Sequence, residues 1–415
     1  MPKGWKEVKL GEVINHQKGY AFKSDSYITE GVRIIRISDT TRNSIHDNSP
    51  VYIDENETAS LSQYKLNAED IILSTVGSRP HLLDSMVGKA VKVPVKDRGA
   101  LLNQNLVKIV PKNSLITNNY LFSMITKSKF NYFISTLVRG NANQVSITLK
   151  ELFAYTFPLP PLPEQQKIAK ILSTWDKAIS TTERLIDNST QQKKALMQQL
   201  LTSKKRLLDE SGERFKGEWE EVKLGKVSDV RDGTHDSPEF IDVGYPLITS
   251  KNLLSSGRLD LSNVKFISEE DYLQINKRSG VNDGDILFGM IGTIGNPVKV
   301  KSSNYAIKNV ALIKETGGLL NGFLIYYLSS HDIDKQIHRL NAGGTQKFVA
   351  LGVLRNLVIR LPTQQEQQKI ATVLINADKE IELLGQQLAD LQQEKKALMQ
   401  VLLTGKVRVV VDGES

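Results

Sequence analysis

Two long stretches of the chain carry apolar or small residues at spacings that alternate mostly between three and four. In the first stretch these positions are Ile171, Trp175, Ile179, Thr182, Ile186, Ser189, Leu196 and Leu200. In the second they are Ile370, Val373, Ala377, Ile381, Leu384, Leu388, Leu391, Leu398 and Leu402. This spacing predicts two helices, each with one apolar seam of the coiled-coil kind. Prolines before each stretch and Gly405 after the second are typical of helix ends.

The two stretches are copies of each other. EQQKIAKIL from Glu164 recurs as EQQKIATVL from Glu366, and KKALMQQLLT from Lys193 recurs as KKALMQVLLT from Lys395. A helix from about residue 163 to 205 could not stand alone with such a seam in water, so we predict that the two pair with each other. An antiparallel pair would place two globes at opposite ends, related by a pseudo-two-fold axis. Two unrelated surface helices would not explain the shared phase of the seam.

The segments outside these helices mix short β-branched runs, turn signals and one or two short helices. Runs from Val32, Glu69 and Lys89 predict strands in the first globe, and runs from Pro246, Gly284 and Asn296 take the same places in the second. Segments from Asn119 and Asn321 predict helices. We therefore expect mixed α/β (α+β) globes in duplicate at residues 1–159 and 208–361, with helical regions at 160–207 and 362–415 and a polar connector from Leu208.

Composition restricts the class of protein. The chain has no cysteine, which excludes disulfides and thiolate metal sites. The start MPKGWKEV has no apolar segment, and no run approaches the roughly 18 apolar residues of a membrane span. We therefore expect a cytoplasmic protein without a membrane partner. Residues 1–159 carry 20 lysines and arginines against 14 acidic residues, whereas residues 218–361 carry 17 of each. If the partner is nucleic acid, phosphate contacts would supply non-specific attraction through the first half of the chain.

Four loops combine glycine, hydroxyl, amide and cationic side chains, the mixture that reaches base edges and phosphates in DNA. They lie at residues 77–79, 139–144, 231–235 and 343–347. Gln144 and Gln346 lie at the same offset, 202 residues, as the repeated helices. Any one loop could be an ordinary solvated turn, but their matched positions favour a binding role. His235 could bind at this surface or only stabilise its own turn.

Signals for chemistry are missing. GMIGTIG from Gly289 lacks the spacing and the surrounding unit of a nucleotide-binding motif, so a tight glycine turn or a backbone approach to DNA is favoured. The six histidines have no zinc-like spacing, and there is no G-x-S-x-G nucleophile elbow. Asp70 and Asp285 lie in turns, where capping of the backbone explains them. We expect no catalytic residue, no metal and no cofactor on this chain.

The order of these motifs resembles the DNA-specificity (S) subunit of Type I restriction-modification systems. The resemblance rests on W-x-E-V-x-L-G, RDGTHDSP, GDILFGMIGTIG, a Gly-Gly-Thr-Gln loop and the L-P-x-x-x-E-Q-x-K-I helices, and it covers nearly the whole chain. RDGTHDSP occurs only in the second half; the first has HQKGYAFK from His16. The family implies two target recognition domains, each reading one half of a bipartite sequence in double-stranded DNA, and two helical regions that set the spacer.

The same resemblance implies two methyltransferase subunits that carry S-adenosylmethionine, and restriction subunits that translocate and cut. No N-P-P-[FY] methyltransferase motif occurs in this chain. A scaffold with two ligand-binding heads is the alternative from another class, and an enzyme is the third. The residues that we predict to contact DNA are Lys18, Tyr20, Arg42, Gly77, Ser78, Arg79, Arg139, Asn141, Asn143, Gln144, Arg231, Thr234, His235, Ser250, Lys251, Asn252, Thr293, Gly343, Gly344, Thr345, Gln346 and Lys347.

Overall fold

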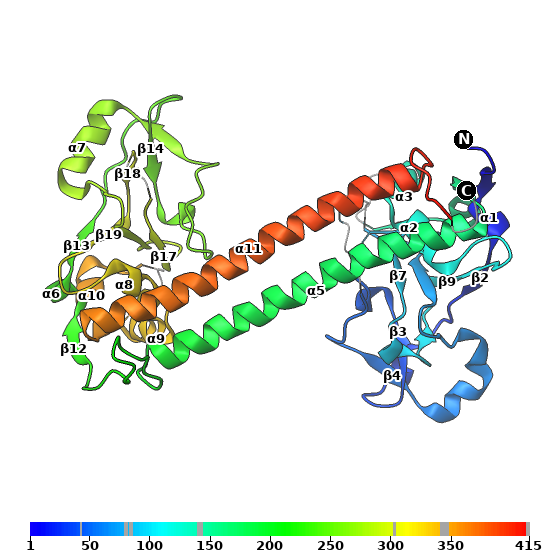
Figure 1. Ribbon diagram of the computed structural model, residues 1–415, viewed down its shortest axis with the longest axis horizontal. Coiled ribbons are helices and arrows are strands. Elements are labelled where there is room, and N and C mark those ends of the chain that lie inside the picture. Colours follow the sequence, from blue (N-terminus) through cyan, green and yellow to red (C-terminus); the bar gives the residue numbers. More distant parts are fainter. Residues whose placement is uncertain are drawn as a thin grey trace. The chain divides into compact units, whose positions relative to one another are not determined.

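The computed structural model describes residues 1–41, 44–78, 82, 86–138, 144–301, 304–340 and 348–411. The chain divides into two compact units (Figure 1). Unit 1 comprises residues 1–182 and 387–415, and unit 2 comprises residues 183–386. Each unit therefore contains one globe together with a stretch of each long helix. Among the described residues, no helix is both long enough and apolar enough to cross a membrane.

The two predicted long helices are present as α5 (Leu162–Leu200) and α11 (Gln364–Leu402). Each has 39 residues, which is about 58 Å at 1.5 Å per residue. The predicted end near residue 205 is wrong, because α5 stops at Leu200 and the chain turns at Ser203, whose φ is 59°. Gly405 takes the same left-handed conformation after α11, with φ 71°.

Within each unit, α5 and α11 pair along the predicted seams (Figure 1). In unit 1, Asp176 forms an ion pair with Lys395. In unit 2, Lys193 pairs with Asp378, and Ser189 Oγ donates to Glu380 Oε1 at 3.2 Å. Later residues of α5 thus meet earlier residues of α11, so the pairing is antiparallel, as predicted. Every predicted seam residue is buried or half-buried. The placement of the globes at opposite ends stays a prediction.

The strands of unit 1 form two main sheets. The first has the order β2 (Ile14–Lys18), β9 (Leu106–Pro111), β5 (Ile71–Ser74) and β7 (Ala90–Lys92), all antiparallel. The second has the order β4 (Val51–Ile53), β3 (Val32–Ile35) and β8 (Leu101–Leu102), in which β3 and β8 are parallel. Two further short pairs occur among the described residues, β1 (Lys6–Lys9) with β11 (Thr156–Leu159) and β6 (Val76–Gly77) with β10 (Val145–Ser146).

Unit 2 repeats this topology. Its four-stranded sheet is β13 (Asp229–Asp232), β19 (Val310–Lys314), β16 (Ile286–Gly289) and β17 (Gly295–Lys299). Its three-stranded sheet is β15 (Lys265–Ile267), β14 (Tyr245–Ile248) and β18 (Ala306–Ile307), again with one parallel pair. β12 (Glu220–Lys223) pairs with β20 (Val358–Leu361). The predicted duplication of a mixed α/β globe is therefore confirmed.

The expectation of one or two short helices per globe is wrong. Unit 1 contains α1 (Leu10–Val13), α2 (Asn118–Thr126), α3 (Ser128–Leu137) and α4 (Leu149–Phe153). Unit 2 contains α6 (Leu224–Val227), α7 (Glu269–Ser279), α8 (Asn321–Leu328), α9 (His331–Leu340) and α10 (Leu351–Arg355). Helix α7 takes the place of a 3-10 segment, Glu55–Tyr64, in unit 1. Most side chains of α7 are polar or charged. It therefore escaped prediction, because periodic apolar positions are the main sequence signal for a helix.

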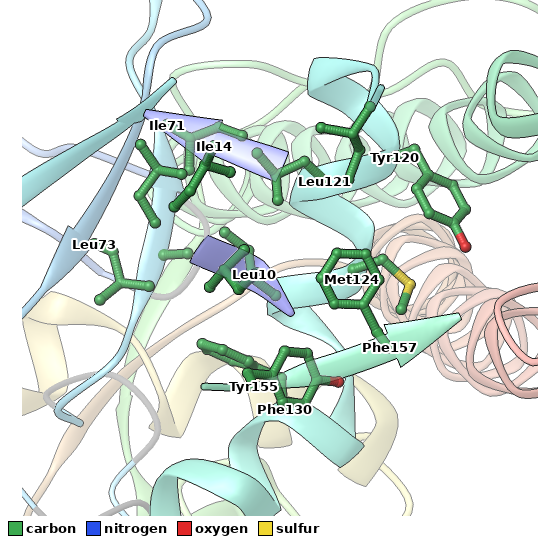
Figure 2. Close-up of a cluster of buried hydrophobic side chains, with 14 of the residues drawn as sticks. Leu10, Ile14, Ile71, Leu73, Tyr120, Leu121, Met124, Phe130, Tyr155 and Phe157 are labelled. Atoms are coloured by element: carbon green, nitrogen blue, oxygen red, sulfur yellow. The ribbon is translucent and has the colours of Figure 1, made fainter. Parts of the chain in front are cut away.

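The core of each unit lies between its four-stranded sheet and its helices. In unit 1, Leu10, Ile71, Leu73 and Met124 are fully buried, and the rings of Phe130, Tyr155 and Phe157 close the cluster (Figure 2). Ile168 and Leu172 of α5 and Leu402 of α11 belong to the same core. In unit 2, the corresponding core contains Leu200 of α5 with Ile370 and Leu374 of α11. The long helices are therefore anchored in both cores through apolar contact.

A buried ion pair joins three segments of unit 2. Glu366, at the start of α11, has no exposed surface. Arg206, which follows α5, donates to it from Nε at 2.6 Å and from Nη2 at 2.8 Å. Trp219 Nε1 donates to the same carboxylate at 3.2 Å. Arg206 also donates from Nη1 to the carbonyl of Gly217 at 2.8 Å. The end of one long helix, the start of the other and the first strand region of the globe meet here.

Unit 1 contains the same arrangement. Glu164, at the start of α5, accepts from Arg408 Nε at 2.8 Å and from Trp5 Nε1 at 3.2 Å. Arg408 Nη1 donates to the carbonyl of Lys3 at 3.1 Å. Arg206 and Arg408 lie 202 residues apart in the sequence, as do Glu164 and Glu366. The duplicated letters of the helices therefore preserve a three-segment junction in each unit.

The structure also explains why a glutamine follows the repeated glutamate at the start of each long helix. Gln165 Nε2 donates to the carbonyls of Leu115 and Pro160, both at 2.9 Å, and its Oε1 accepts from the amide of Thr117. Gln367 makes the equivalent three bonds with Gly318, Pro362 and Leu320. Because both side chains are buried, each satisfies backbone groups that have no water to bond.

We expect Ser203→Gly to stabilise unit 2 by about 1 kcal/mol, since a non-glycine residue pays for the left-handed conformation. The matched control is Gly405→Ser in unit 1. There a Cβ would lie 2.4 Å from Pro2 Cγ, so this change should destabilise unit 1. Urea unfolding of both variants against the wild type measures the difference. A Ser203→Gly protein no more stable than the wild type would show that the turn accommodates serine without strain.

Candidate nucleic-acid interface

In unit 1, a close backbone contact shapes the loop after β2. A Cβ on Gly19 would lie 2.0 Å from the carbonyl oxygen of Asn103, so only glycine fits. Tyr20 then donates its backbone N–H to the carbonyl of Leu102 at 2.8 Å, and the residue is 41% exposed. Lys18, the last residue of β2, is exposed. The predicted residues Lys18 and Tyr20 therefore flank Gly19 at the end of β2, and both are exposed.

The described ends of two predicted loops of unit 1 lie at one short ladder. β6 pairs with β10, with Gly77 opposite Val145, and Gln144 comes directly before Val145. Gly77 is buried, Ser78 is half-buried and bridges to Met86, and Gln144 is exposed directly before β10. Thr75 connects this ladder to the turn before β9, because its N–H donates to the carbonyl of Asn105 at 3.0 Å.

Unit 2 repeats the loop after its first sheet strand. A Cβ on Gly233 would lie 2.4 Å from the carbonyl oxygen of Ile307. Thr234 N–H donates to the same carbonyl at 3.0 Å, and Thr234 is half-buried. Arg231 is half-buried as well; its Nε donates to Asp229 at 2.8 Å, and its Nη1 donates to the carbonyl of Arg278.

Ser250 is the point at which the loops of unit 2 join. Its buried hydroxyl donates to the carbonyl of Asn309 at 3.1 Å and accepts from the amide of Met290 at 3.2 Å. Asn252 is also buried and bonds to backbone groups of its own turn and of Asp260. These two predicted residues hold the loops in place, whereas Lys251 between them is exposed. We therefore assign Ser250 and Asn252 a positioning role.

GMIGTIG is a tight turn between β16 and β17. A Cβ on Gly289 would lie 2.3 Å from the carbonyl oxygen of Thr293, and Gly292 and Gly295 have φ values of 75° and 91°. The glycine-turn interpretation is therefore confirmed. Thr293 is exposed at its tip. Ile291 bridges to Phe348, as Val76 pairs with Ser146 in unit 1, so Phe348 lies against this turn.

His235 lies beside a hollow of about 490 Å³ between its loop and α7. Its Nδ1 is 2.8 Å from Asn309 Oδ1 and its Nε2 is 3.0 Å from Asp232 Oδ2. Arg278 of α7 donates to the other oxygen of Asp232. Hydrogen bonds that the ring donates to Asn309 and to Asp232 raise the pKa of His235. The ring is more than half exposed.

Several predicted residues lie outside the part of the chain that the structure describes, and their contact with DNA stays a prediction. They are Arg42, Arg79, Arg139, Asn141, Asn143, Gly343, Gly344, Thr345, Gln346 and Lys347. Within the described ranges, no group of three or more histidine, aspartate or glutamate side chains could hold a metal ion. The acidic residues Asp70 and Asp285 accept backbone N–H groups of their own turns at 2.7 and 2.8 Å, as predicted.

The sequence did not predict Asn309 and Arg278, which lie beside the loop of His235. Asn309 has φ 54°, and it joins the loop of His235 to that of Ser250. A signal existed, because an asparagine directly precedes the corresponding strand in each half, Asn105 before β9 and Asn309 before β19. Arg278 gave no such signal, since it lies on α7, where unit 1 has a 3-10 segment instead.

Comparison with known proteins points to one family. The model of the Type I restriction modification DNA specificity domain matches residues 2–189 and 216–393. The MjaVIII specificity subunit of a Type I restriction enzyme from Methanocaldococcus jannaschii is 27% identical, over 99% of this chain and 94% of the relative. The EcoBI specificity subunit from Escherichia coli is 26% identical over 88% of this chain and 77% of its own length.

A solved structure shares the fold. The crystal structure of the Type-I restriction-modification S subunit from M. genitalium superposes with a TM-score of 0.61 at 15% identity, and the match covers 96% of each chain. At this level of identity the likeness concerns the arrangement of strands and helices alone.

Proposed function

Because the chain belongs to the family of Type I restriction modification DNA specificity domains, we propose that it is the subunit that selects the DNA sequence for a restriction-modification complex. Each globe reads one half of a bipartite target in double-stranded DNA. The paired helices set the spacer and bind two methyltransferase subunits, and restriction subunits join the same complex. This chain supplies no catalytic group, and S-adenosylmethionine binds the methyltransferase subunits.

One observation carries the proposal. The two units share the strand order of their main sheets and a glycine contact at the end of the first sheet strand, but the side chains beside this glycine differ. Gly19 and Gly233 mark the same position, since their N–H groups bond to the residues that start β9 and β19. Beside them stand Lys18 and Tyr20 in unit 1, and Asp232 and Thr234 in unit 2. Two globes of the same fold that carry different side chains are suited to bind two different DNA sequences, because side-chain chemistry distinguishes base edges.

Exchange of one globe tests this function. A chain whose residues 1–157 come from a relative of different specificity should change one half-site of the methylated sequence and leave the other unchanged. The physical reason is that the junction around Glu164 depends on residues shared by the repeat, whereas the loops vary. Single-molecule sequencing of DNA methylated by the chain with its methyltransferase partner gives both half-sites. Simultaneous change of both half-sites would contradict independent reading.

Two controls separate the alternatives. A DNA-reading subunit must lose affinity steeply with salt, because phosphate contacts release counterions. A scaffold with two ligand-binding heads would show no such binding to random duplex at low salt. The isolated chain should also neither methylate nor cleave DNA, and saturable binding of S-adenosylmethionine to it would contradict the assignment of that cofactor to the partner.

A further inference from the structure

Both ring nitrogens of His235 lie within hydrogen-bonding distance of an oxygen. Asp232 Oδ2 is an acceptor only, and it lies 3.0 Å from Nε2. The amide oxygen of Asn309 lies 2.8 Å from Nδ1. A neutral imidazole has one N–H and one bare nitrogen, so it can satisfy one of these acceptors, whereas the imidazolium donates to both. With the amide oxygen of Asn309 facing Nδ1, both hydrogen bonds form only when His235 is protonated.

Through these two hydrogen bonds, the ring of His235 connects its own loop to the turn of Asn309, to Ser250 and to α7. Asn309 N–H donates to the carbonyl of Thr234 at 3.1 Å, and the carbonyl of Asn309 accepts from Ser250. Asp232 accepts from Arg278, so the ring is also tied to α7. Loss of the proton would remove one hydrogen bond of the ring. This bond lies where the loop of His235, the turn of Asn309, the loop of Ser250 and α7 meet. The reading loop at residues 231–235 would then lose its fixed position.

The charges around His235 come from three elements. Its own loop supplies Asp232 and Asp236, α7 supplies Arg278 and Asp271, and the turn before β19 supplies Lys308, which donates to Ser237. Among these, Asp232 favours the charged ring and Arg278 opposes it. The hydrogen bonds to Asn309 and Asp232 raise the pKa of His235 above its ordinary value. The contribution of this ring is therefore complete below about pH 6.5 and is lost as the pH rises through the higher folded value.

The matching loop of unit 1, at residues 18–21, carries other groups. Ala21 follows Tyr20 where His235 follows Thr234, and Lys18 stands where Asp232 stands. Tyr20 instead contacts the rings of Phe22 and Tyr64, with centroids 5.0 and 5.2 Å away. The loop of unit 1 is thus supported by ring contacts that do not depend on a proton.

We propose that protonated His235 is a positioning residue for the reading loop of unit 2, so that recognition of the half-site read by unit 2 weakens as this ring loses its proton. Recognition by unit 1 is independent of this group. The inference rests on the proposed function, and it adds that the two half-sites respond differently to pH.

The test uses the full chain and duplexes built from the methylated sequence. One duplex carries both half-sites, and two others carry only one half-site each, with the other scrambled. Fluorescence anisotropy at constant ionic strength between about pH 6 and pH 9 gives the affinity for each. We expect the duplex with only the unit 2 half-site to lose roughly tenfold in affinity, as for one hydrogen bond to a charged group. The duplex with only the unit 1 half-site should change less.

Two variants distinguish this role from a merely structural one. His235→Gln should give a flat profile for the unit 2 half-site. Asn309→Asp places a carboxylate beside the ring and tolerates the left-handed backbone, so the midpoint of the profile should move to higher pH. A structural role would alter affinity without moving the midpoint. A wild-type profile in either variant would overturn the inference.

A measurement on the wild type covers the case in which His235→Gln does not fold. If DNA prefers the protonated ring, the unit 2 half-site must raise the pKa of His235 in an NMR titration, because the coupling between proton and DNA is reciprocal. An unchanged value would overturn the inference. Absence of salt-dependent binding to any duplex at any pH would instead overturn the proposed function itself.

Discussion

Replacing Glu366 with alanine is expected to lower the free energy of unfolding of unit 2 by about 3 to 5 kcal/mol, the cost of breaking a buried ion pair. The change leaves the guanidinium of Arg206 without its carboxylate in a site where that side chain is only 18% exposed. It also leaves Trp219 Nε1 without an acceptor. Glu366→Gln keeps the shape but loses the charge, so it should cost less than Glu366→Ala.

Hydrogen exchange read by mass spectrometry measures this effect with an internal reference. Peptides from unit 2 should lose protection in Glu366→Ala, while peptides from the globe of unit 1 should keep theirs. The matched control is Gln368→Ala, two residues along the same helix, because Gln368 is exposed. If unit 2 were protected equally well in Glu366→Ala and in Gln368→Ala, the junction would not hold the unit together.

The corresponding junction in unit 1 allows the same test on the other unit. Glu164 accepts from Arg408 and Trp5 as Glu366 accepts from Arg206 and Trp219. Glu164→Ala should therefore reduce protection in unit 1 and spare the globe of unit 2. A double-mutant cycle between Glu366 and Arg206 separates their interaction from the cost of leaving one charge unpaired.

Lengthening both long helices by one heptad is expected to move the two half-sites apart by up to about three base pairs. Seven residues add roughly 10 Å at 1.5 Å per residue, and DNA rises about 3.4 Å per base pair. Insertions after Thr182 and after Leu388 suit the pairing. The ion pairs Asp176 with Lys395 and Lys193 with Asp378 are separated by equal numbers of residues on both helices. The half-site sequences should not change, because no globe residue is altered.

Sequencing of the DNA methylated by the lengthened chain and its methyltransferase partner measures the spacer. Three added base pairs also rotate one half-site by roughly 100° around the duplex, so a weaker complex is expected beside the longer spacer. Insertion of two residues at the same points is the matched control, because it turns the apolar seam away from the partner helix and should abolish activity. An active heptad variant that methylated only the original spacing would refute the proposal that the paired helices set the spacer.

Part of the candidate site could be predicted from the sequence. Gly19, Gly77 and Gly233 belong to segments rich in glycine and polar residues, which mark exposed turns by local chemistry. Whether a polar residue in such a turn faces solvent is not local. Ser250 and Lys251 are neighbours in the chain, yet Ser250 is buried against Asn309 and Met290, and Lys251 is exposed. Their composition predicted a contact with DNA for both residues. Only the fold shows that one is buried and the other exposed.

The sequence by itself determined the paired helices and the duplication, because a seam repeats within one helix and a copy repeats along the chain. Tertiary structure decided the rest, since its contacts join residues that are distant in sequence. The parallel pairing of β3 with β8 joins Ile34 to Leu101. The junction joins Arg206 to Glu366, and the ring of His235 meets Asn309. Such partners satisfy buried or charged groups only after the chain has folded, and no local pattern of apolar positions specifies them.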